Sequence, residues 1–414
     1  MTVGELQRRS LGLIVFLGAA GLASASPSRI SSRVAACVDC HGQVSLRDTV
    51  HARLACADCH AGLVRRDGSP PHQPKKDLPA PVCGASCHTA PAGAPGGGPS
   101  AYSDSVHGRA YLERHEPEVA RCWDCHGSHA IKPVADAGSP VNRLNIPLTC
   151  SRCHEDMAVV LKYNIHAESP YREYSRSVHG RSLAPEGGPE YAAVCTDCHG
   201  VHDIQGVGAK TLQAREPRTC GACHRQAFED YSLSIHGREA AKGNRDVPLC
   251  VDCHGEHAIA PPASPGSPTA KARIPDTCSA CHARPEIMGK YGVPADRIAT
   301  FIDSFHGIAV GMGGTAEAIC VDCHGVHDIR PAADPGSTVF PANLARTCGR
   351  PGCHPKMTAK IAGARIHRDY SRRSSGAPYY VREALLWAVL LAAALSFLYL
   401  LPALLRRGRG PRKP

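Results

Sequence analysis

All 22 cysteines of this 414-residue chain belong to one short pattern. In nine places two cysteines are separated by two residues and the second is followed directly by histidine: Cys37/Cys40/His41, Cys56/Cys59/His60, Cys122/Cys125/His126, Cys150/Cys153/His154, Cys195/Cys198/His199, Cys220/Cys223/His224, Cys250/Cys253/His254, Cys278/Cys281/His282 and Cys320/Cys323/His324. Two pairs are stretched, Cys83/Cys87/His88 by three intervening residues and Cys348/Cys353/His354 by four. The chemistry must therefore use two thiols and an adjacent imidazole together.

Three chemistries compete for such a pattern. A disulfide framework suits an exported chain with an even number of cysteines, but it gives no role to the histidine. Zinc ribbons would combine two motifs into one four-thiolate site and again ignore that residue. Attachment of c-type haem uses every element, because the thiols add to the two vinyl groups and the imidazole binds the iron. We therefore expect haem at the nine standard motifs and also at the two stretched ones, where a longer loop still spans the vinyl groups.

With these motifs the chain resembles the periplasmic multihaem c-type cytochromes with doubled Cys-x-x-Cys-His motifs, a cytochrome c3-like class found in anaerobic respiratory and metal-reducing bacteria. The resemblance covers roughly residues 37–367 and rests on all eleven motifs. It defines the class and does not point to one protein within it. It implies about eleven covalently bound haem c groups that pack closely together.

The remaining histidines supply candidates for the second axial ligand of each haem. Of 24 histidines, eleven stand in the motifs and thirteen remain. Seven of these follow an apolar residue: His51, His107, His166, His179, His236, His306 and His367. Four others end an extended motif, Cys-His-Gly-x-His: His129, His202, His257 and His327. Together they number eleven, one for each haem, which leaves His72 and His115 unassigned.

The position of the second group restricts which haem it can serve. A histidine one helical turn after a motif histidine lies on the same side of that haem. We therefore expect each of these four to ligate a neighbouring haem, with hydrogen bonding to haem propionates as the alternative. Four methionines, Met157, Met288, Met312 and Met357, could also ligate, but they match no repeated position.

The elements that carry the motifs are predicted to be short. The chain contains 40 glycines and 34 prolines, and its middle is poor in large apolar side chains. Such a segment cannot bury enough apolar surface for an ordinary core. We expect a mainly α and coil fold, with short helices and long loops wrapped around closely packed haems that replace the core.

Internal repeats organise this middle section. From residue 101 a unit of two motifs recurs four times, and each copy begins with Ser-x-His-Gly, at Ser105, Ser177, Ser234 and Ser304. Each second motif is preceded by threonine. The predicted domains are a three-haem segment with a Gly/Pro linker at 26–100 and an eight-haem domain at 101–370.

The two ends predict export and anchoring. Residues 1–25 have the basic, apolar and small-residue regions of a signal peptide, with an uncleaved anchor as the alternative. After a juxtamembrane linker at 371–383, residues 384–405 form an uncharged apolar span long enough for a transmembrane helix, followed by a basic tail at 406–414. By the positive-inside rule, the tail is cytoplasmic and the haem domain lies in the periplasm, anchored to the inner membrane.

The net charge does not predict nucleic-acid binding. Of the formal charge of +10, the signal peptide carries +1 and the tail +5, which leaves +4 outside the membrane. Each ferric haem adds about −1 through its propionates, which brings the loaded domain to roughly −7. We therefore expect no nucleic-acid partner.

Two ligands on each iron predict electron transfer rather than catalysis. We expect a membrane-anchored conduit that links a quinol-oxidising or cytochrome b-type membrane subunit to other periplasmic cytochromes, a terminal reductase or outer-membrane acceptors in anaerobic respiration. The alternative is a multihaem reductase of nitrite, hydroxylamine or tetrathionate, which would need one haem with an open face. A structural haem scaffold or filament subunit is a third hypothesis.

Overall fold

The computed structural model describes residues 46, 48–60, 83, 88, 99–165, 169–183, 191–206, 210–314, 316–362, 366–369 and 371–407. The predicted signal peptide and the last seven residues lie outside these ranges. Most of the predicted Gly/Pro linker before residue 101 lies outside them as well. So do several predicted or unassigned site residues, namely Cys37, Cys40, His41, His72, Cys87 and His166.

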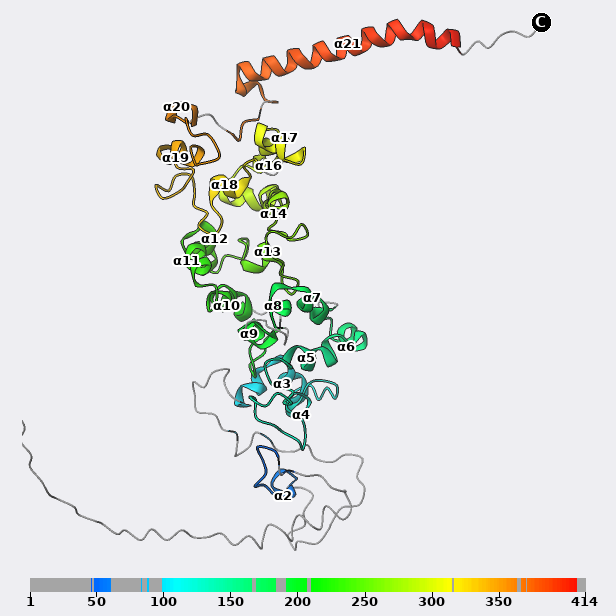
Figure 1. Cartoon of the computed structure of the whole chain (residues 1–414), viewed down its shortest axis with the longest axis vertical. Coiled ribbons are helices and arrows are strands. Elements are labelled where there is room, and N and C mark those ends of the chain that lie inside the picture. Colours follow the sequence, from blue (N-terminus) through cyan, green and yellow to red (C-terminus); the bar gives the residue numbers. More distant parts are fainter. Residues whose placement is uncertain are drawn as a thin grey trace, which may run out of the picture. The chain divides into compact units, whose positions relative to one another are not determined.

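The chain divides into two compact units. The first comprises residues 1–88 together with Gly127–Pro133, and the second comprises Thr89–His126 and Val134–Pro414. The short return of the chain to the first unit carries the first extended motif histidine, His129. Where the structure is described, it is mainly helical and contains no strand. Figure 1 shows short helices joined by irregular segments, as predicted from the glycine and proline content.

The helices follow the repeats, which we number 1 to 4 from their initial serines. The first unit contains α2 (Cys56–Cys59). Repeat 1 has η3 (Pro99–Asp104), α3 (Val106–Leu112), α4 (Cys122–His126), α5 (Ile146–His154) and α6 (Met157–Lys162). Repeat 2 has α7 (Pro170–Arg176), α8 (Val178–Ser182), α9 (Cys195–His199) and α10 (Lys210–Gly221). Helix α7 is assigned to repeat 2 because it ends directly before the initial serine, Ser177.

Repeats 3 and 4 have the same order, with additional short turns. Repeat 3 has α11 (Arg225–Leu233), α12 (Ile235–Ala241), α13 (Cys250–His254), η4 (Lys271–Arg273), α14 (Ile274–His282), α15 (Pro285–Met288) and η5 (Gly289–Tyr291). Repeat 4 has α16 (Arg297–Ile302), α17 (Phe305–Gly311), α18 (Cys320–His324), η6 (Pro341–Asn343), α19 (Leu344–Cys348) and α20 (Ala359–Ala362). The chain then continues through η7 (Arg373–Ser375) into α21 (Ala377–Arg407).

The buried side chains of the described residues are few and small. The apolar ones are Ala110, Val119, Val160, Ala192, Val194, Ala270, Met288, Phe301, Ile319 and Ala362. Six serines that recur in the repeats are at most 2 % exposed: Ser105, Ser139, Ser177, Ser234, Ser267 and Ser337. The most buried positions of the described residues therefore include serines that recur from repeat to repeat, and these do not form a continuous apolar core.

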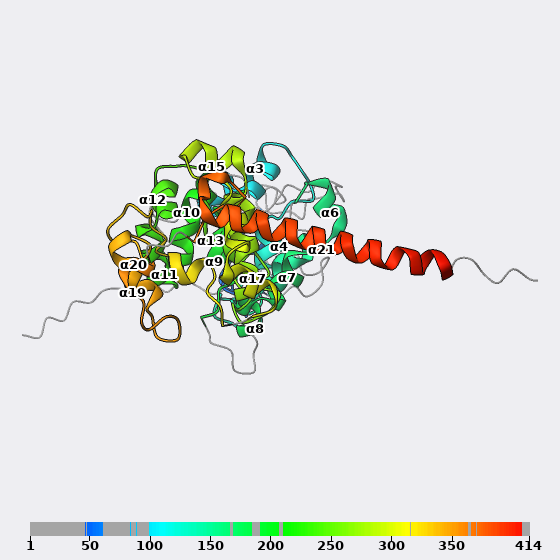
Figure 2. The ribbon, with the colours of Figure 1, turned by 90° about the horizontal axis from the view of Figure 1, so that it is seen from above.

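Helix α21 is the one helix of the described residues that is long and apolar enough to cross a membrane. The apolar span is Ala377–Leu401, 25 residues, or roughly 37 Å of helix against a hydrocarbon core of about 30 Å. The helix begins seven residues before the predicted span, because Pro378 in its first turn has a φ angle suited to a helix start. Residues 377–383 of the predicted juxtamembrane linker are thus helical, and Figure 2 shows α21 as one uninterrupted element.

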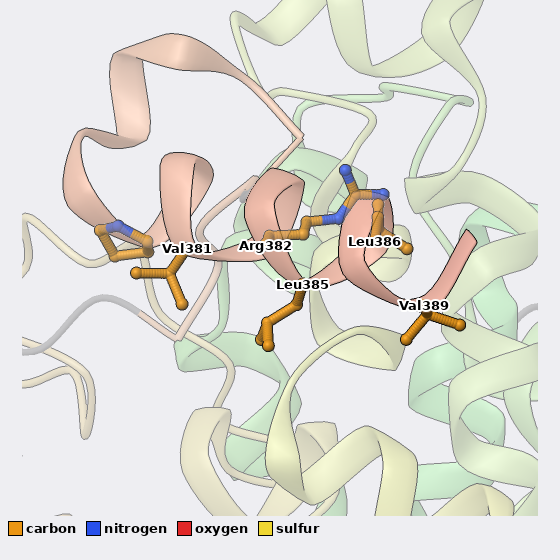
Figure 3. A pocket seen from close by; sticks show the side chains of 6 residues that line it. Val381, Arg382, Leu385, Leu386 and Val389 are labelled. Atoms are coloured by element: carbon orange, nitrogen blue, oxygen red, sulfur yellow. The ribbon is translucent and has the colours of Figure 1, made fainter. Parts of the chain in front are cut away.

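A shallow hollow follows one face of the first turns of α21. It is lined by Pro378, Val381, Arg382, Leu385, Leu386 and Val389 (Figure 3). All six residues belong to α21, so the hollow is a feature of the apolar helix surface and not of the cysteine and histidine motifs.

Candidate histidine-pair centres

The ten motif histidines that the structure describes each lie opposite one histidine from outside the motifs. The ring centres are 5.8 Å apart in the first pair and 6.0–6.2 Å apart in the other nine. The pairs are His51–His88, His60–His129, His107–His154, His126–His202, His179–His224, His199–His257, His236–His282, His254–His327, His306–His354 and His324–His367. Both stretched motifs contribute a pair in the same way as the standard ones.

Half of the pairs form within one repeat. In each repeat the histidine of Ser-x-His-Gly lies opposite the histidine of the second motif, as in His236–His282 at 6.2 Å. The first unit follows the same rule, since His51 pairs with His88. The segment before residue 101 therefore contains a further copy of the two-motif pattern, which the sequence analysis did not recognise because Thr49 replaces the initial serine.

The other pairs join consecutive copies. The last histidine of each Cys-His-Gly-x-His peptide lies opposite the first-motif histidine of the preceding copy: His129 opposite His60, His202 opposite His126, His257 opposite His199, and His327 opposite His254. None of the four pairs with the motif histidine three residues before it. In repeat 4, where no further copy follows, His367 takes this position opposite His324.

The separation of these rings fits one metal ion held between two imidazoles. Two metal–nitrogen bonds of about 2 Å, plus the distance from each ring centre to its nitrogen, amount to roughly 6 Å. The rings are too far apart for a direct hydrogen bond, and their interplanar angles range from 16° to 75°. Stacking therefore does not explain the constant distance. Within the described residues, no three His, Cys, Asp or Glu side chains converge as a zinc site of the ribbon type would require.

A local Ser-Gly device positions the first histidine of each repeat. The buried Ser234 caps α12, since its Oγ accepts the Gly237 N–H at 2.9 Å and donates to the Tyr231 carbonyl at 2.6 Å. A side chain at Gly237 would overlap that same carbonyl oxygen, so only glycine fits. The serine cap recurs at Ser105, Ser177 and Ser304. His236 is thereby fixed in the first turn of its helix.

A tyrosine connects this device to the first motif of the same repeat. Tyr231 donates its hydroxyl to the Pro248 carbonyl at 2.9 Å, two residues before Cys250. Tyr102 and Tyr174 make equivalent bonds to Ala120 and Ala193, at 2.8 and 2.9 Å. Burial, with help from nearby thiols, raises the pKa of Tyr102 to about 12, so the hydroxyl keeps its proton. In repeat 4 the buried Phe301 takes the place of the tyrosine.

The motif helices have their own cap. The aspartate before the second cysteine accepts the backbone N–H of the residue before the first one, as Asp197 does from Val194 at 2.7 Å. Asp58, Asp124, Asp252 and Asp322 do the same. In the second motifs, the threonine before the first cysteine donates instead, Thr149 to Pro140, Thr277 to Pro268 and Thr347 to Thr338, at 2.6–2.7 Å. Both devices hold the two cysteines on a short helical turn.

One backbone hydrogen bond recurs between consecutive copies. The residue before the first paired histidine donates its N–H to an isoleucine carbonyl that follows the next copy's extended motif. The bonds are Val50 to Ile131, Val106 to Ile204, Val178 to Ile259 and Ile235 to Ile329, at 2.8–3.0 Å. Within each of the two units, this contact and the histidine pairs between copies hold consecutive copies in the same register.

The cysteines of neighbouring motifs lie close together. The thiols of Cys150 and Cys195 are in hydrogen-bonding contact, as are Cys220 with Cys250 and Cys278 with Cys320. Each pair joins the second motif of one repeat to the first motif of the next. The described cysteines form no disulfides. Groups attached at these motifs would consequently lie against each other along the chain.

The second cysteine of the second motif is more exposed in repeats 2 and 4 than these paired thiols. Cys223 and Cys353 are exposed, and Cys281 is half-buried. The chain around the first two is nevertheless ordered by backbone hydrogen bonds, from the Cys223 N–H to the Cys220 carbonyl at 3.2 Å and from the Cys353 N–H to the Arg350 carbonyl at 3.0 Å. The thioether bonds expected at Cys223, Cys281 and Cys353 stay predictions.

Burial favours the neutral form of several of the paired imidazoles. Burial, together with the opposite histidine of each pair, lowers the pKa of His107, His236 and His324 to about 4. A neutral imidazole is the form that binds a metal. His367 Nδ1 lies 3.0 Å from the Arg297 carbonyl, which favours the tautomer with a proton on Nδ1 and leaves Nε2 for coordination.

His115 is the one unassigned histidine within the described residues. It is exposed, has a left-handed φ of 55° and belongs to none of the pairs. Its position agrees with its place outside the predicted ligand set. The pair expected for His41 and the partner of His166 fall outside the described residues.

No family model matches the chain, and no solved structure is detectably similar to it. The class of the protein therefore rests on its own residues.

Proposed function

We propose that the chain is a membrane-anchored multihaem c-type cytochrome that conducts electrons between a quinol-oxidising membrane partner and periplasmic or outer-membrane acceptors. The observation that supports it most is the pairing of every described motif histidine with one further histidine at a nearly constant 5.8–6.2 Å. Haem c bound between such imidazoles supplies an iron that gains and loses single electrons without binding substrate.

The residues fit this group. At each described motif the histidine and its paired histidine would hold the iron, and the flanking cysteines would attach the haem through thioethers. Thiol contacts such as Cys150–Cys195 would keep successive groups close enough for electron tunnelling. Oxidation of a quinol releases two electrons and two protons, so two one-electron transfers into the chain balance each quinol.

The membrane attachment and the side of the membrane belong to the same proposal. Helix α21 would anchor the chain in the inner membrane, with the basic residues 406–414 in the cytoplasm. The haem domain would then lie in the periplasm, where export precedes haem attachment. The residues of α21 contain no histidine, so the helix would hold no haem of its own.

The stoichiometry is tested by denaturing mass spectrometry of the purified protein. We expect a chain that starts near Ser26 and carries eleven haem increments, one for each motif. Nine increments would show that the stretched motifs Cys83/Cys87 and Cys348/Cys353 are unmodified. None would reject the class.

The ligation is tested by spectroscopy of the oxidised and reduced protein. We expect low-spin iron throughout and no binding of carbon monoxide or nitrite. A stoichiometric high-spin centre that binds either molecule would reject the conduit and favour a reductase.

A further inference from the structure

Helix α17 differs from its counterparts in the other repeats along one face. The residue after Ser-x-His-Gly is arginine in repeats 1 to 3, at Arg109, Arg181 and Arg238, and is Ile308 in repeat 4. Four residues further on, Glu113 and Lys242 of repeats 1 and 3 correspond to Met312.

Together with Phe305 these residues form an apolar stripe at helical spacing, which we call the α17 stripe. Phe305 is 81 % exposed, Ile308 48 % and Met312 84 %. Single exposed apolar residues are common, but three on one face of a helix, two of them at positions that are charged in other repeats, are not explained by the fold of the repeat.

The α17 stripe lies at the open end of an interface that the chain uses four times. In the preceding copies, the N–H at the position of Phe305 donates to an isoleucine carbonyl of the next copy, as Ile235 does to Ile329 at 2.8 Å. Repeat 4 is the last copy, and the described residues offer the Phe305 N–H no acceptor. The Phe305 N–H is therefore a backbone donor beside exposed apolar side chains. A polypeptide segment could complement this surface with a carbonyl oxygen and an aliphatic side chain.

Its place in the chain puts this end next to the membrane helix. The segment that leads to α21 packs on α16, where Arg297 donates to the His367 carbonyl at 3.2 Å and Arg372 lies 3.9 Å from Asp296. Helix α16 contacts α17 in turn, and both are labelled beside each other in Figure 1. His306, the residue after Phe305, forms the pair with His354 at 6.1 Å.

We propose that the α17 stripe is the docking site of an integral membrane protein that exchanges electrons with the chain through the His306–His354 pair. This inference rests on the proposed function and specifies where the membrane partner binds. A polypeptide occupant is favoured over lipid because the four inner copies of the interface all use a peptide carbonyl. A partner seated there would be within reach of the pair, since His306 lies in the first turn of the same helix.

The contact is tested by photocrosslinking in native membranes with the full-length, haem-loaded chain. A photoreactive residue at position 308 should form one discrete adduct with an integral membrane protein. The matched control places it at Leu161, which is 73 % exposed on α6 of repeat 1, and should form no such adduct. The same adduct from both positions, none from position 308, or an adduct only with lipid or a second copy of this chain would overturn the proposal.

A charge-restoring variant tests the functional role of the same contact. Ile308→Arg/Met312→Glu introduces the side chains that repeat 1 carries at these positions, so the helix should fold and keep its haems. In native membranes given a reduced quinol, we expect haem reduction to slow about tenfold or more, which corresponds to a loss of at least about 1.4 kcal/mol of docking. Leu161→Arg should behave like the wild type, and dithionite should reduce all three proteins equally.

The two experiments separate the docking site from the proposed donor. An adduct from position 308 without reduction of the wild type by quinol would reject the quinol-oxidising donor and keep the docking site. Normal quinol reduction of the double variant would overturn the docking site and keep the conduit.

Discussion

At the residue scale, each Cys-His-Gly-x-His peptide holds two imidazoles that face different partners. In repeat 3, His254 lies opposite His327 and His257 lies opposite His199 of repeat 2, at 6.1 and 6.0 Å. The Nδ1 atom of His257 lies 3.8 Å from the carboxylate of Glu173, which belongs to repeat 2 as well. A single short peptide therefore connects two histidine pairs. Its second imidazole, His257, belongs to the pair with the motif histidine of the preceding repeat.

Replacing His257 by methionine should consequently alter the haem attached at Cys195 and Cys198, not the one attached at Cys250 and Cys253. Exchange of an axial imidazole for a thioether raises the reduction potential of the affected centre. We expect one potential to rise in a redox titration, while mass spectrometry still shows all haems attached.

The control for His257→Met is His115→Asn, which removes an exposed imidazole outside the pairs and places a residue tolerant of left-handed backbone there. It should leave every potential unchanged. An unchanged titration of His257→Met itself would mean that His257 only hydrogen-bonds a propionate.

Much of the candidate site could be predicted from residue types and counts. Eleven motif histidines and eleven further histidines gave the predicted ligand set, and the position of His129 after His126 predicted a partner outside its own motif. The actual partner, His60, could not be predicted, because 69 residues separate the two and no local rule fixes how the copies stack. The pairing of each of these histidines with the preceding copy is seen only in the distances between the rings.

At the element scale, the Ser-x-His-Gly sequence is explained by a close backbone approach. The predicted short helices before each Ser-x-His-Gly sequence are confirmed as η3, α7, α11 and α16, but the reason for the glycine lies in the preceding turn. A Cβ at Gly237 would overlap the backbone carbonyl of Tyr231, which itself accepts the Ser234 hydroxyl. Sequence alone showed the repetition of this glycine and not its cause, since the contact depends on how α11 meets α12.

Gly237→Ala should therefore destabilise the haem-loaded protein by about 1–3 kcal/mol, the usual cost of forcing an extra carbon into a packed site. Chemical denaturation followed by haem absorbance measures the loss. Gly266→Ala is the matched control, because a Cβ there meets no atom within 4 Å and its φ is not positive. Equal stability of the two variants would contradict the packing argument.

The tyrosine bond between α11 and the first motif can be tested separately. Tyr231→Phe removes only the hydroxyl that donates to Pro248, and we expect a loss of about 1 kcal/mol of unfolding free energy. Repeat 4 already carries Phe301 at this position, so a phenylalanine ring fits. A loss of haem, rather than a small loss of stability, would show that the bond is needed for attachment.

At the scale of the whole molecule, the pairs alternate between two kinds. Second motifs are completed within their own copy, while first motifs are completed by the following copy. Each copy therefore depends on its successor for one paired histidine, which resembles the nearest-neighbour dependence of repeat proteins. The last copy needs a different source, and the chain supplies it with His367 shortly before α21. The C-terminal part of the chain thus supplies both the partner of His324 and the apolar helix α21, and truncations can separate these two roles.

Two truncations distinguish these roles. A chain that ends at Gly376 retains His367 and the contacts of Ser375 with Arg368 and Asp369, but lacks α21. We expect it to move from the membrane to the soluble fraction with all its iron low-spin.

A chain that ends at Ala362 also loses His367, and with it the partner of His324. It too should be soluble, but one haem in about eleven should become high-spin or bind carbon monoxide, as electron paramagnetic resonance and absorbance titration would show. A fully low-spin spectrum of this shorter chain would mean that His324 finds its second ligand elsewhere, and the role assigned to His367 would be wrong. Because repeat 4 keeps every other predicted ligand in both chains, a spin-state change confined to the shorter chain is expected from the loss of the His367 imidazole at the end of the array.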